Sequence, residues 1–409
     1  MAEAATSPLG LALGYFLRMH SVRIGLGVLA LFVLVAIYAP FLASETAIVW
    51  RDADGVSFPL FAELFNRRSY PQRHDLLFNL LVFLAPALAI AWWALRRRWR
   101  PWRRVLWSLA IVTVAWIACQ VPMLPSGGSW QAVWNDRPSP EETVRRHRAF
   151  AADDAPGAVF ALVPHRYDAP YQGAILRRPG TVNESSGRAF LLGSDAVGFD
   201  VFARMVFGAR ISLTIGLVAT GLSLLIGTII GALSGYLGGW VDIVLQRLVE
   251  IMMCFPTFIL VLTVIAMTSR SIFIIMIVLG LTGWAGTARL VRGEFLSQSV
   301  REYVTAAHAL GLPQWRIMFR HILPNSLSPL LISATFGVTG SIFTESGLAF
   351  LGLGDPNAPS WGLLLNQGRE NIAYSWLIYI PGLAVFALLT ALNQIGNGLR
   401  EALDPKSQR

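Results

Sequence analysis

Charged residues are scarce in this sequence. Only 14% of its 409 residues are Asp, Glu, Lys or Arg, whereas 55% are hydrophobic and the mean hydropathy is +0.55. A soluble domain of ordinary composition carries about 25% charged residues. The deficit argues against a soluble globular protein and predicts a chain embedded in a membrane.

Lysine is almost absent as well. Of the 33 Lys and Arg residues, Lys406 alone is a lysine. A phosphate-binding loop needs Gly-Lys followed by Ser or Thr, and no glycine-rich loop precedes Lys406. Any ATP hydrolysis linked to this chain should therefore take place on another chain. The net charge of +9 is interpreted as a signal of membrane topology and not of nucleic-acid binding.

Catalytic and metal-binding patterns are missing too. Cys119 and Cys254 fall in separate apolar segments, which favours packing roles over a disulfide. The six histidines have no metal-ligand spacing, and no Gly-x-Ser-x-Gly elbow occurs. We expect no catalytic residue, no metal site and no cofactor bound by this chain.

The apolar residues form runs near the length of about 20 residues that crosses a bilayer. The first run is interpreted as a retained span because no signal-peptide cleavage site follows it. The fifth holds Arg247 and Glu250 in its first turns and is interrupted by Pro256. We predict an all-α polytopic membrane protein with eight spans: Ile24–Leu42, Leu76–Leu95, Val105–Leu124, Ile211–Tyr236, Ile243–Met267, Ser271–Ala288, Ser326–Phe350 and Trp376–Ile395.

Arginines in a short link indicate the orientation. Residues 96–104 hold six arginines and no acid, which is typical of a cytoplasmic loop. Counting outward puts both termini and the loop 289–325 in the cytoplasm, and the polar stretch 125–210 outside. The predicted division is 1–75 (first span and outer loop), 76–124 (helical hairpin), 125–210 (outer subdomain with a lead-in helix) and 211–409 (core).

Small residues recur at every fourth position of the fourth span, at Gly227, Gly231 and Gly235. On a helix they form one face, which lets a neighbouring backbone come close. Helix packing is the first interpretation, and a face that lines a substrate pathway is the alternative.

The segment before this span carries several charges. Ser194 or Asp195 is positioned to cap a short helix, and Asp200 and Arg204 have the i,i+4 spacing of a helix ion pair. A solvated lead-in helix that continues to Arg210 accounts for most of this. The alternative is an outer platform or gate that guides a substrate.

Glu345 lies near the outer end of the seventh predicted span. A carboxylate at membrane depth is costly unless it is paired or hydrated, so a role in a substrate or ion pathway is one hypothesis. A satisfied structural carboxylate is the other.

The loop 289–325 has the most informative pattern. Residues 301–310 favour a helix, and Gly311 stands where a left-handed C-terminal cap belongs. Pro313 fits the first turn of a second short helix, which Pro324 should end. The small side chains Ala306 and Ala307 suit close docking into a partner's groove, whereas a plain surface connector would not require this layout.

These residues carry a resemblance. Ala306-Ala307, then Gly311 and Leu323-Pro324, are similar to the "EAA" loop of ABC importer permeases. In that family the loop forms a coupling helix on the ATPase subunit. Thr305 stands where Glu is usual, but Glu302-Tyr303-Val304 matches the variant of the dipeptide, oligopeptide and nickel subfamily.

Further motifs extend the resemblance over more than half of the chain. Phe199 departs from the usual Arg, and residues 51–59 resemble the microcin C and oligopeptide branch. A C-type subunit of this kind has six spans, so 76–124 is an inserted helical pair. The matching segments are Leu192-Gly193-Ser194-Asp195, Arg210-Ile211-Ser212-Leu213, Gly238-Gly239-Trp240-Val241-Asp242, Phe255-Pro256, Phe350-Leu351-Gly352-Leu353-Gly354, Trp361-Gly362 and residues 399–405.

The resemblance implies a type I ABC importer subunit in a bacterial inner membrane. It would form half of a channel for peptides or peptide-like solutes with a second, homologous permease as a heterodimer. Two ATPase subunits holding ATP and Mg²⁺, and an outer substrate-binding protein, would complete it. The implied ATPase-coupling residues are Glu302, Ala306, Ala307, Gly311, Leu323 and Pro324. The alternative is an ATPase-independent transporter or channel that uses a membrane carboxylate.

Overall fold

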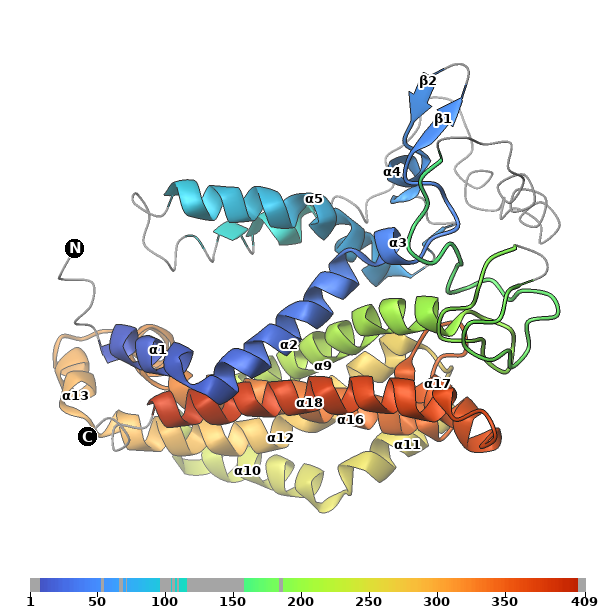
Figure 1. Ribbon diagram of the computed structural model, residues 1–409. Helices are drawn as coiled ribbons and strands as arrows, with labels where there is room; N and C mark the ends of the chain where they lie inside the picture. Colours follow the sequence, from blue (N-terminus) through green and yellow to red (C-terminus); the bar gives the residue numbers. More distant parts are fainter. Residues whose placement is uncertain are drawn as a thin grey trace, which may run out of the picture. The chain divides into compact units, whose positions relative to one another are not determined.

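The computed structural model describes residues 8–52, 55–65, 69–70, 72–95, 104, 107–108, 110–115, 158–183 and 187–403. Their contacts divide into two compact units. Unit 1 comprises residues 1–31, 212–356 and 382–409, and unit 2 comprises residues 32–211 and 357–381. The helices α2 (His20–Ile37), α9 (Val201–Leu237) and α18 (Trp376–Leu403) contribute residues to both (Figure 1).

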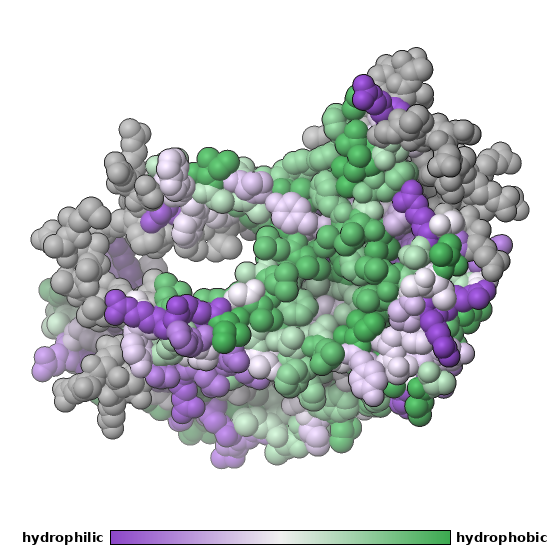
Figure 2. Space-filling view, viewed as in Figure 1, coloured by the Kyte–Doolittle hydropathy of each residue, from purple (hydrophilic) through white to green (hydrophobic). Residues whose placement is uncertain are grey.

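The described residues contain six helices long and apolar enough to cross a membrane, and a seventh candidate made of two helices. Each corresponds to one predicted span. Figure 2 shows hydrophobic side chains over much of the viewed face. The remaining predicted span, Val105–Leu124, which is the third along the chain, lies largely outside the described residues, as does Cys119. The six single helices are α2, α5 (Arg73–Ala94), α9, α12 (Ile272–Ser299), α16 (Leu327–Phe350) and α18.

The predicted fifth span is broken in two. The helices α10 (Gly239–Cys254) and α11 (Thr257–Met267) meet at an angle of 78° (Figure 1). Pro256 disfavours helical geometry in the residue before it, and Phe255 is extended with φ −84° and ψ 129°. The sequence indicated this interruption but not the size of the bend. Cys254 is an exposed free thiol.

In unit 1, α9 and α12 pack backbone to backbone. A Cβ built on Gly227 would come within 2.7 Å of the Trp284 carbonyl oxygen, and one on Gly235 within 2.7 Å of the Arg292 carbonyl oxygen. The face of small residues therefore serves helix packing. The small helix α1 (Pro8–Arg18) and the elements of the 300–325 region complete the unit: α13 (Glu302–Ala309), α14 (Gln314–Arg316), the π-helix η3 (Ile317–Ile322) and α15 (Leu323–Asn325).

Unit 2 contains α5, the adjoining ends of α2, α9 and α18, and several short elements. Strand β1 (Trp50–Asp52) pairs antiparallel with β2 (Gly55–Ser57), with Arg51 opposite Val56. Trp361 begins α17 and is buried, and its indole donates to the Met205 carbonyl of α9 over 2.9 Å. Gly208 leaves the space that the Trp361 ring occupies. The remaining short helices are α3 (Ala39–Leu42), α4 (Pro59–Glu63) and α17 (Trp361–Glu370).

Two predicted boundaries are wrong. The lead-in helix is not a separate solvated element, because α9 runs unbroken from Val201 and its first turns are buried. Likewise α12 continues to Ser299, so the predicted loop 289–325 begins as helix. In both places helical residues extend beyond the apolar run, and hydropathy alone does not reveal the continuation.

Candidate functional site

The loop that follows α12 begins with the short helix α13. Its residues Val304 and Ala307, three apart, are buried, whereas Glu302 and Ala306 are exposed. This three-residue spacing places Val304 and Ala307 on one helix face. The helix therefore has an inner face fixed to the protein and an outer face open to a partner.

Gly311 ends α13 as predicted. Its φ is +69°, and its N–H bonds to the His308 carbonyl over 2.9 Å. The Leu312 N–H reaches back to the Ala307 carbonyl over 3.2 Å. These two bonds form a Schellman cap, which favours glycine because the left-handed conformation is costly for other residues.

The second part of the loop differs in detail from the prediction. Pro313 is the residue before α14 and not its first helical residue. The chain then widens into the π-helix η3, and helical turns end at Asn325, one residue after Pro324. The proline ring clashes with a carbonyl four residues earlier in a regular helix, and a wider turn before it avoids that contact.

The underside of the loop is bound to three long helices. One cluster of buried residues joins Val304 and Ala307 of α13 to Phe295 of α12, Ala232 of α9 and Leu330 of α16. The same cluster takes in Ile317, Met318 and Ile322 of η3. The underside of the loop therefore packs directly on α9, α12 and α16.

The outer side of the same region exposes large apolar side chains. Val300 is 80% exposed, Leu310 79% and Trp315 64%, and Phe319 is also exposed. Exposed apolar side chains of this size are typical of protein interfaces. They flank α13, so the loop has an anchored underside and an apolar outer side.

Polar contacts reinforce the ends of the adjoining helices. Arg292 of α12 donates two hydrogen bonds of 2.6 Å to the Asp242 carboxylate of α10, and Ser234 of α9 donates to the same carboxylate. Tyr236 of α9 hydrogen-bonds His308 of α13 over 3.1 Å, with the rings stacked. Asp242 belongs to a motif that the sequence analysis noted without assigning it a role.

The predicted outer residues are buried and paired. Arg204 donates to Asp195 over 2.8 Å and lies 4.3 Å above the Phe199 ring, and both charged side chains are at most 2% exposed. Asp195 also accepts the N–H groups of residues 197, 198 and 199. The predicted i,i+4 ion pair of Asp200 with Arg204 does not form, because Arg204 is paired with Asp195.

Asp200 is the cap of α9, a role the sequence analysis gave to Ser194 or Asp195. Its carboxylate accepts the Ala203 N–H over 2.7 Å and contacts Nδ1 of His165 over 3.1 Å. His165 is fully buried, stacked on Phe190 and edge-on to Tyr171. The local geometry favours a structural role at this position.

Arg210 is fully buried in unit 2. It donates to the Asp75 carboxylate over 2.9 Å, to Asn79 over 2.7 Å and to the Ala36 carbonyl over 2.7 Å. Tyr167 donates to the other Asp75 oxygen over 2.9 Å. Burial, with the nearby negative charge of Asp75, raises the pKa of Tyr167 well above its ordinary value, so this donor stays protonated.

Asp75, Asn79 and His165 are partners that were not among the predicted site residues. A usable signal existed for two of them, because Asp75 and Asn79 are polar residues at i,i+4 near the start of a helix that is apolar after its first turn except for Asn79. The sequence contains no comparable signal for His165, because its partner Asp200 is 35 residues away in the chain.

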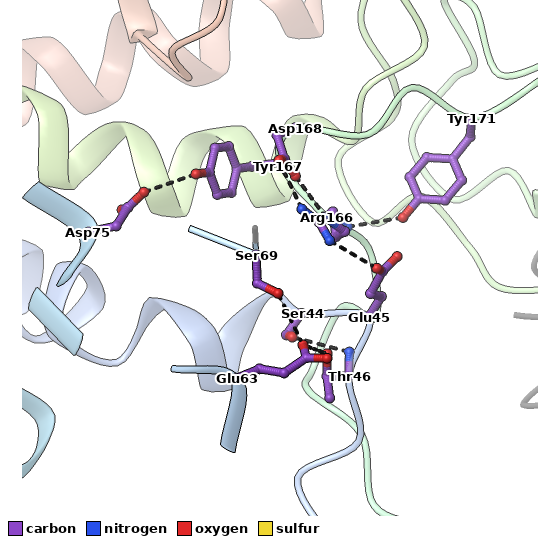
Figure 3. Close-up of polar contacts among 10 residues, drawn as sticks. All are labelled: Ser44, Glu45, Thr46, Glu63, Ser69, Asp75, Arg166, Tyr167, Asp168 and Tyr171. Atoms are coloured by element: carbon purple, nitrogen blue, oxygen red, sulfur yellow. Dashed lines mark hydrogen bonds and ion pairs between the residues drawn. The ribbon is translucent and has the colours of Figure 1, made fainter. Parts of the chain in front are cut away.

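A second polar group lies in the same unit (Figure 3). Arg166 binds Asp168 over 2.8 Å and Glu45 over 3.2 Å, and Tyr171 accepts its backbone N–H. Glu63 accepts hydrogen bonds from Thr46 and Ser69. No group of three or more His, Cys, Asp or Glu side chains in the described part of the chain could hold a metal ion.

Glu345 is on the buried face of α16 and is 2% exposed. Its neighbour Ser346 lies within 3.4 Å of the carboxylate. On the same face, Ile342 packs against Gly216 of α9. The carboxylate is therefore enclosed within unit 1, and its predicted pathway role stays a prediction.

Comparison with known proteins decides the family. The family described as binding-protein-dependent transport system inner membrane component matches residues 227–409. The oligopeptide transport system permease OppC of Bacillus subtilis is 36% identical over 255 residues, covering 62% of this chain and 82% of that protein. The chain belongs to this family. It is a multi-pass inner-membrane permease subunit of an ABC importer, a transport component and not an enzyme.

Two further relatives differ in the transport system that their names give. The glutathione transport system permease GsiD of Pectobacterium atrosepticum is 34% identical, covering 68% of this chain and 91% of that protein. The peptidoglycan transport system permease YejE of Agrobacterium fabrum is 40% identical, covering 53% of this chain and 57% of that protein. The ABC importer hypothesis is confirmed, and the ATPase-independent alternative loses its basis.

Proposed function

We propose that this permease imports peptides or peptide-containing solutes and is coupled to ATPase subunits through residues 302–324. The observation that carries the coupling is the two-sided loop: Val304 and Ala307 bind the core while Leu310 and Trp315 are exposed. The substrate class rests on the relatives, whose names specify oligopeptide, glutathione and peptidoglycan transport.

The partners follow from the family and from what this chain lacks. An ABC importer of this family requires ATPase subunits and a substrate-binding protein. We propose two ATPases, which hold ATP and Mg²⁺, and one homologous permease as the second half of the channel. Both termini lie in the cytoplasm in this proposal, because residues 96–104 hold six arginines and no acid.

The mechanism is a shift between two conformations. Closure of the ATPase pair on ATP displaces α13 and η3. Because their buried side chains share one cluster with α9, α12 and α16, the displacement moves these helices together. ATP binding then favours one state of the channel to the extent that the ATPases bind that state more tightly.

Uptake by the reconstituted complex tests this proposal. The permease, its partner permease and the ATPases are placed in liposomes with the binding protein, and entry of a labelled tripeptide is followed with and without ATP. The proposal predicts ATP-dependent accumulation that a non-hydrolysable ATP analogue does not support. Accumulation without ATPase subunits would contradict the coupling, and accumulation of a nickel chelate but of no peptide would contradict the substrate class.

A further inference from the structure

Described residues of the segment 76–124, the predicted inserted hairpin, line an apolar cavity that the proposed transport function does not use. The cavity has a volume of about 110 Å³ and lies between α5 and described residues of the segment that follows it. Its walls include Leu88 of α5, Leu95 directly after that helix, Ile111, and the rings of Trp92 and Trp107. An apolar cavity of about 150 Å³ holds a benzene-sized molecule, so this one has room for a short piece of hydrocarbon chain.

One charged side chain borders the cavity. The guanidinium carbon of Arg104 lies 5.0 Å from the centre of the Trp92 ring, and Nη1 is 3.4 Å from the Trp92 carbonyl oxygen. Its Nε is buried and has no hydrogen-bond partner. Among the described residues, no ion pair includes Arg104. No carboxylate among the described residues neutralises its positive charge, which is therefore available to an anion.

The polar contacts around Arg104 fix the Trp92 ring. The Trp92 indole donates to Oγ of Ser108 over 2.9 Å, which joins α5 to the described residues of the following segment. Trp107 in the cavity wall is 57% exposed, and Trp93 on α5 is 67% exposed. Tryptophans at such a boundary are typical of the membrane–water interface, where the ring is in contact with both apolar and polar surroundings.

The sequence supplies complementary charge for an anionic lipid. Residues 96–104 hold six arginines without an acid, and basic segments next to a membrane helix attract anionic headgroups. Setting the topology requires only the arginines. It does not require an apolar cavity bordered by an arginine to which the described residues offer no carboxylate.

We propose that this cavity binds an anionic phospholipid. The phosphate is held by Arg104, and the first part of an acyl chain enters between the two tryptophan rings and the aliphatic side chains of α5. The hairpin is then a lipid-binding attachment that holds the permease in an anionic membrane.

Native mass spectrometry of the purified complex tests the proposal. The complex is exposed to vesicles of phosphatidylglycerol and phosphatidylethanolamine in equal amounts, and the bound phospholipids are counted. Wild type should retain phosphatidylglycerol in preference. Arg104→Gln should weaken that binding roughly five-fold, the contribution of one arginine near a charged membrane surface.

Two further variants complete the design. Arg247→Gln is the matched control: Arg247 is 73% exposed and paired with Glu250 over 2.6 Å, and its loss should leave lipid retention unchanged. Ala91→Phe fills the cavity and should lower retention with Arg104 intact, which keeps the proposal testable if Arg104→Gln fails to fold. Equal retention by wild type and Ala91→Phe, or no preference for phosphatidylglycerol in wild type, would overturn the proposal.

Discussion

Gly231 of α9 lies directly against the carbonyl oxygen of Ala288 on α12, and a Cβ built on it would come within 2.5 Å of that oxygen. Gly227 and Gly235, one turn away on either side, make the same kind of approach. Small residues at every fourth position let the two backbones touch. This contact joins α9 to the helix that leads into the candidate coupling loop.

Gly231→Ala should therefore destabilise the permease. The added methyl group meets backbone and not a flexible side chain, so the helices must separate, at a cost of about 1–3 kcal/mol. Gly221→Ala, on the same helix with nothing within 4 Å, should be neutral or stabilising by less than about 1 kcal/mol. Thermal unfolding of both purified variants checks the prediction, and equal melting temperatures would contradict it.

Removing one member of the buried Asp195–Arg204 pair should be severe. Asp195→Asn leaves the Arg204 charge buried without its carboxylate, which costs about 3–5 kcal/mol. The double variant Asp195→Asn, Arg204→Leu should recover part of that loss, because no uncompensated charge remains. The measurement is the folded fraction after purification together with uptake.

The same pair of variants separates the structural role from a pathway role. If Asp195 and Arg204 act as an outer gate, the double variant should remain folded and lose uptake. We expect folding and uptake to recover together, since the two side chains are enclosed and bind each other.

The Asp242–Arg292 contact should show measurable coupling. A double-mutant cycle with Asp242→Asn and Arg292→Gln is expected to give about 0.5–3 kcal/mol, because the contact is bidentate and joins α10 to α12. The Arg247–Glu250 pair is more exposed and should give no more than about 0.5 kcal/mol. Chemical unfolding of the single and double variants measures both cycles.

Glu345→Gln tests the role of the membrane carboxylate. In an ATP-driven importer no ion has to bind at Glu345, so the neutral isostere should keep uptake within about two-fold of wild type, a barrier change of about 0.4 kcal/mol. Uptake by both proteins is compared across an imposed proton or sodium gradient. Loss of uptake in the variant, combined with a gradient dependence in wild type, would restore the ATPase-independent alternative.

The spans could be predicted because each is a long apolar run. The Gly311 cap could be predicted because the left-handed conformation at a helix end favours glycine. The end of α12 could not, because helical residues continue past the apolar run to Ser299. The size of the bend at Pro256 could not be predicted either, because a proline shows where a helix stops but not the direction of the next helix.

The pairing of the outer charges needed the structure. The spacing of Asp200 and Arg204 fits an ion pair within one helix. In the structure Arg204 pairs with Asp195, and Asp200 contacts His165. Both outcomes depend on a loop folding back over the start of α9, and residue spacing within one helix does not encode such contacts. The buried partners of Arg210 come from α5 and α2 for the same reason.

The central claim is that the outer side of the loop docks on an ATPase, and retention of the ATPase during purification tests it most directly. Leu310→Asp puts a charge on a side chain that is 79% exposed, and Ile372→Asp is the matched control at 74% exposure in unit 2. We expect Leu310→Asp to lose most of the ATPase while the permease remains folded, and Ile372→Asp to retain it. Full retention and full uptake in Leu310→Asp would contradict this account.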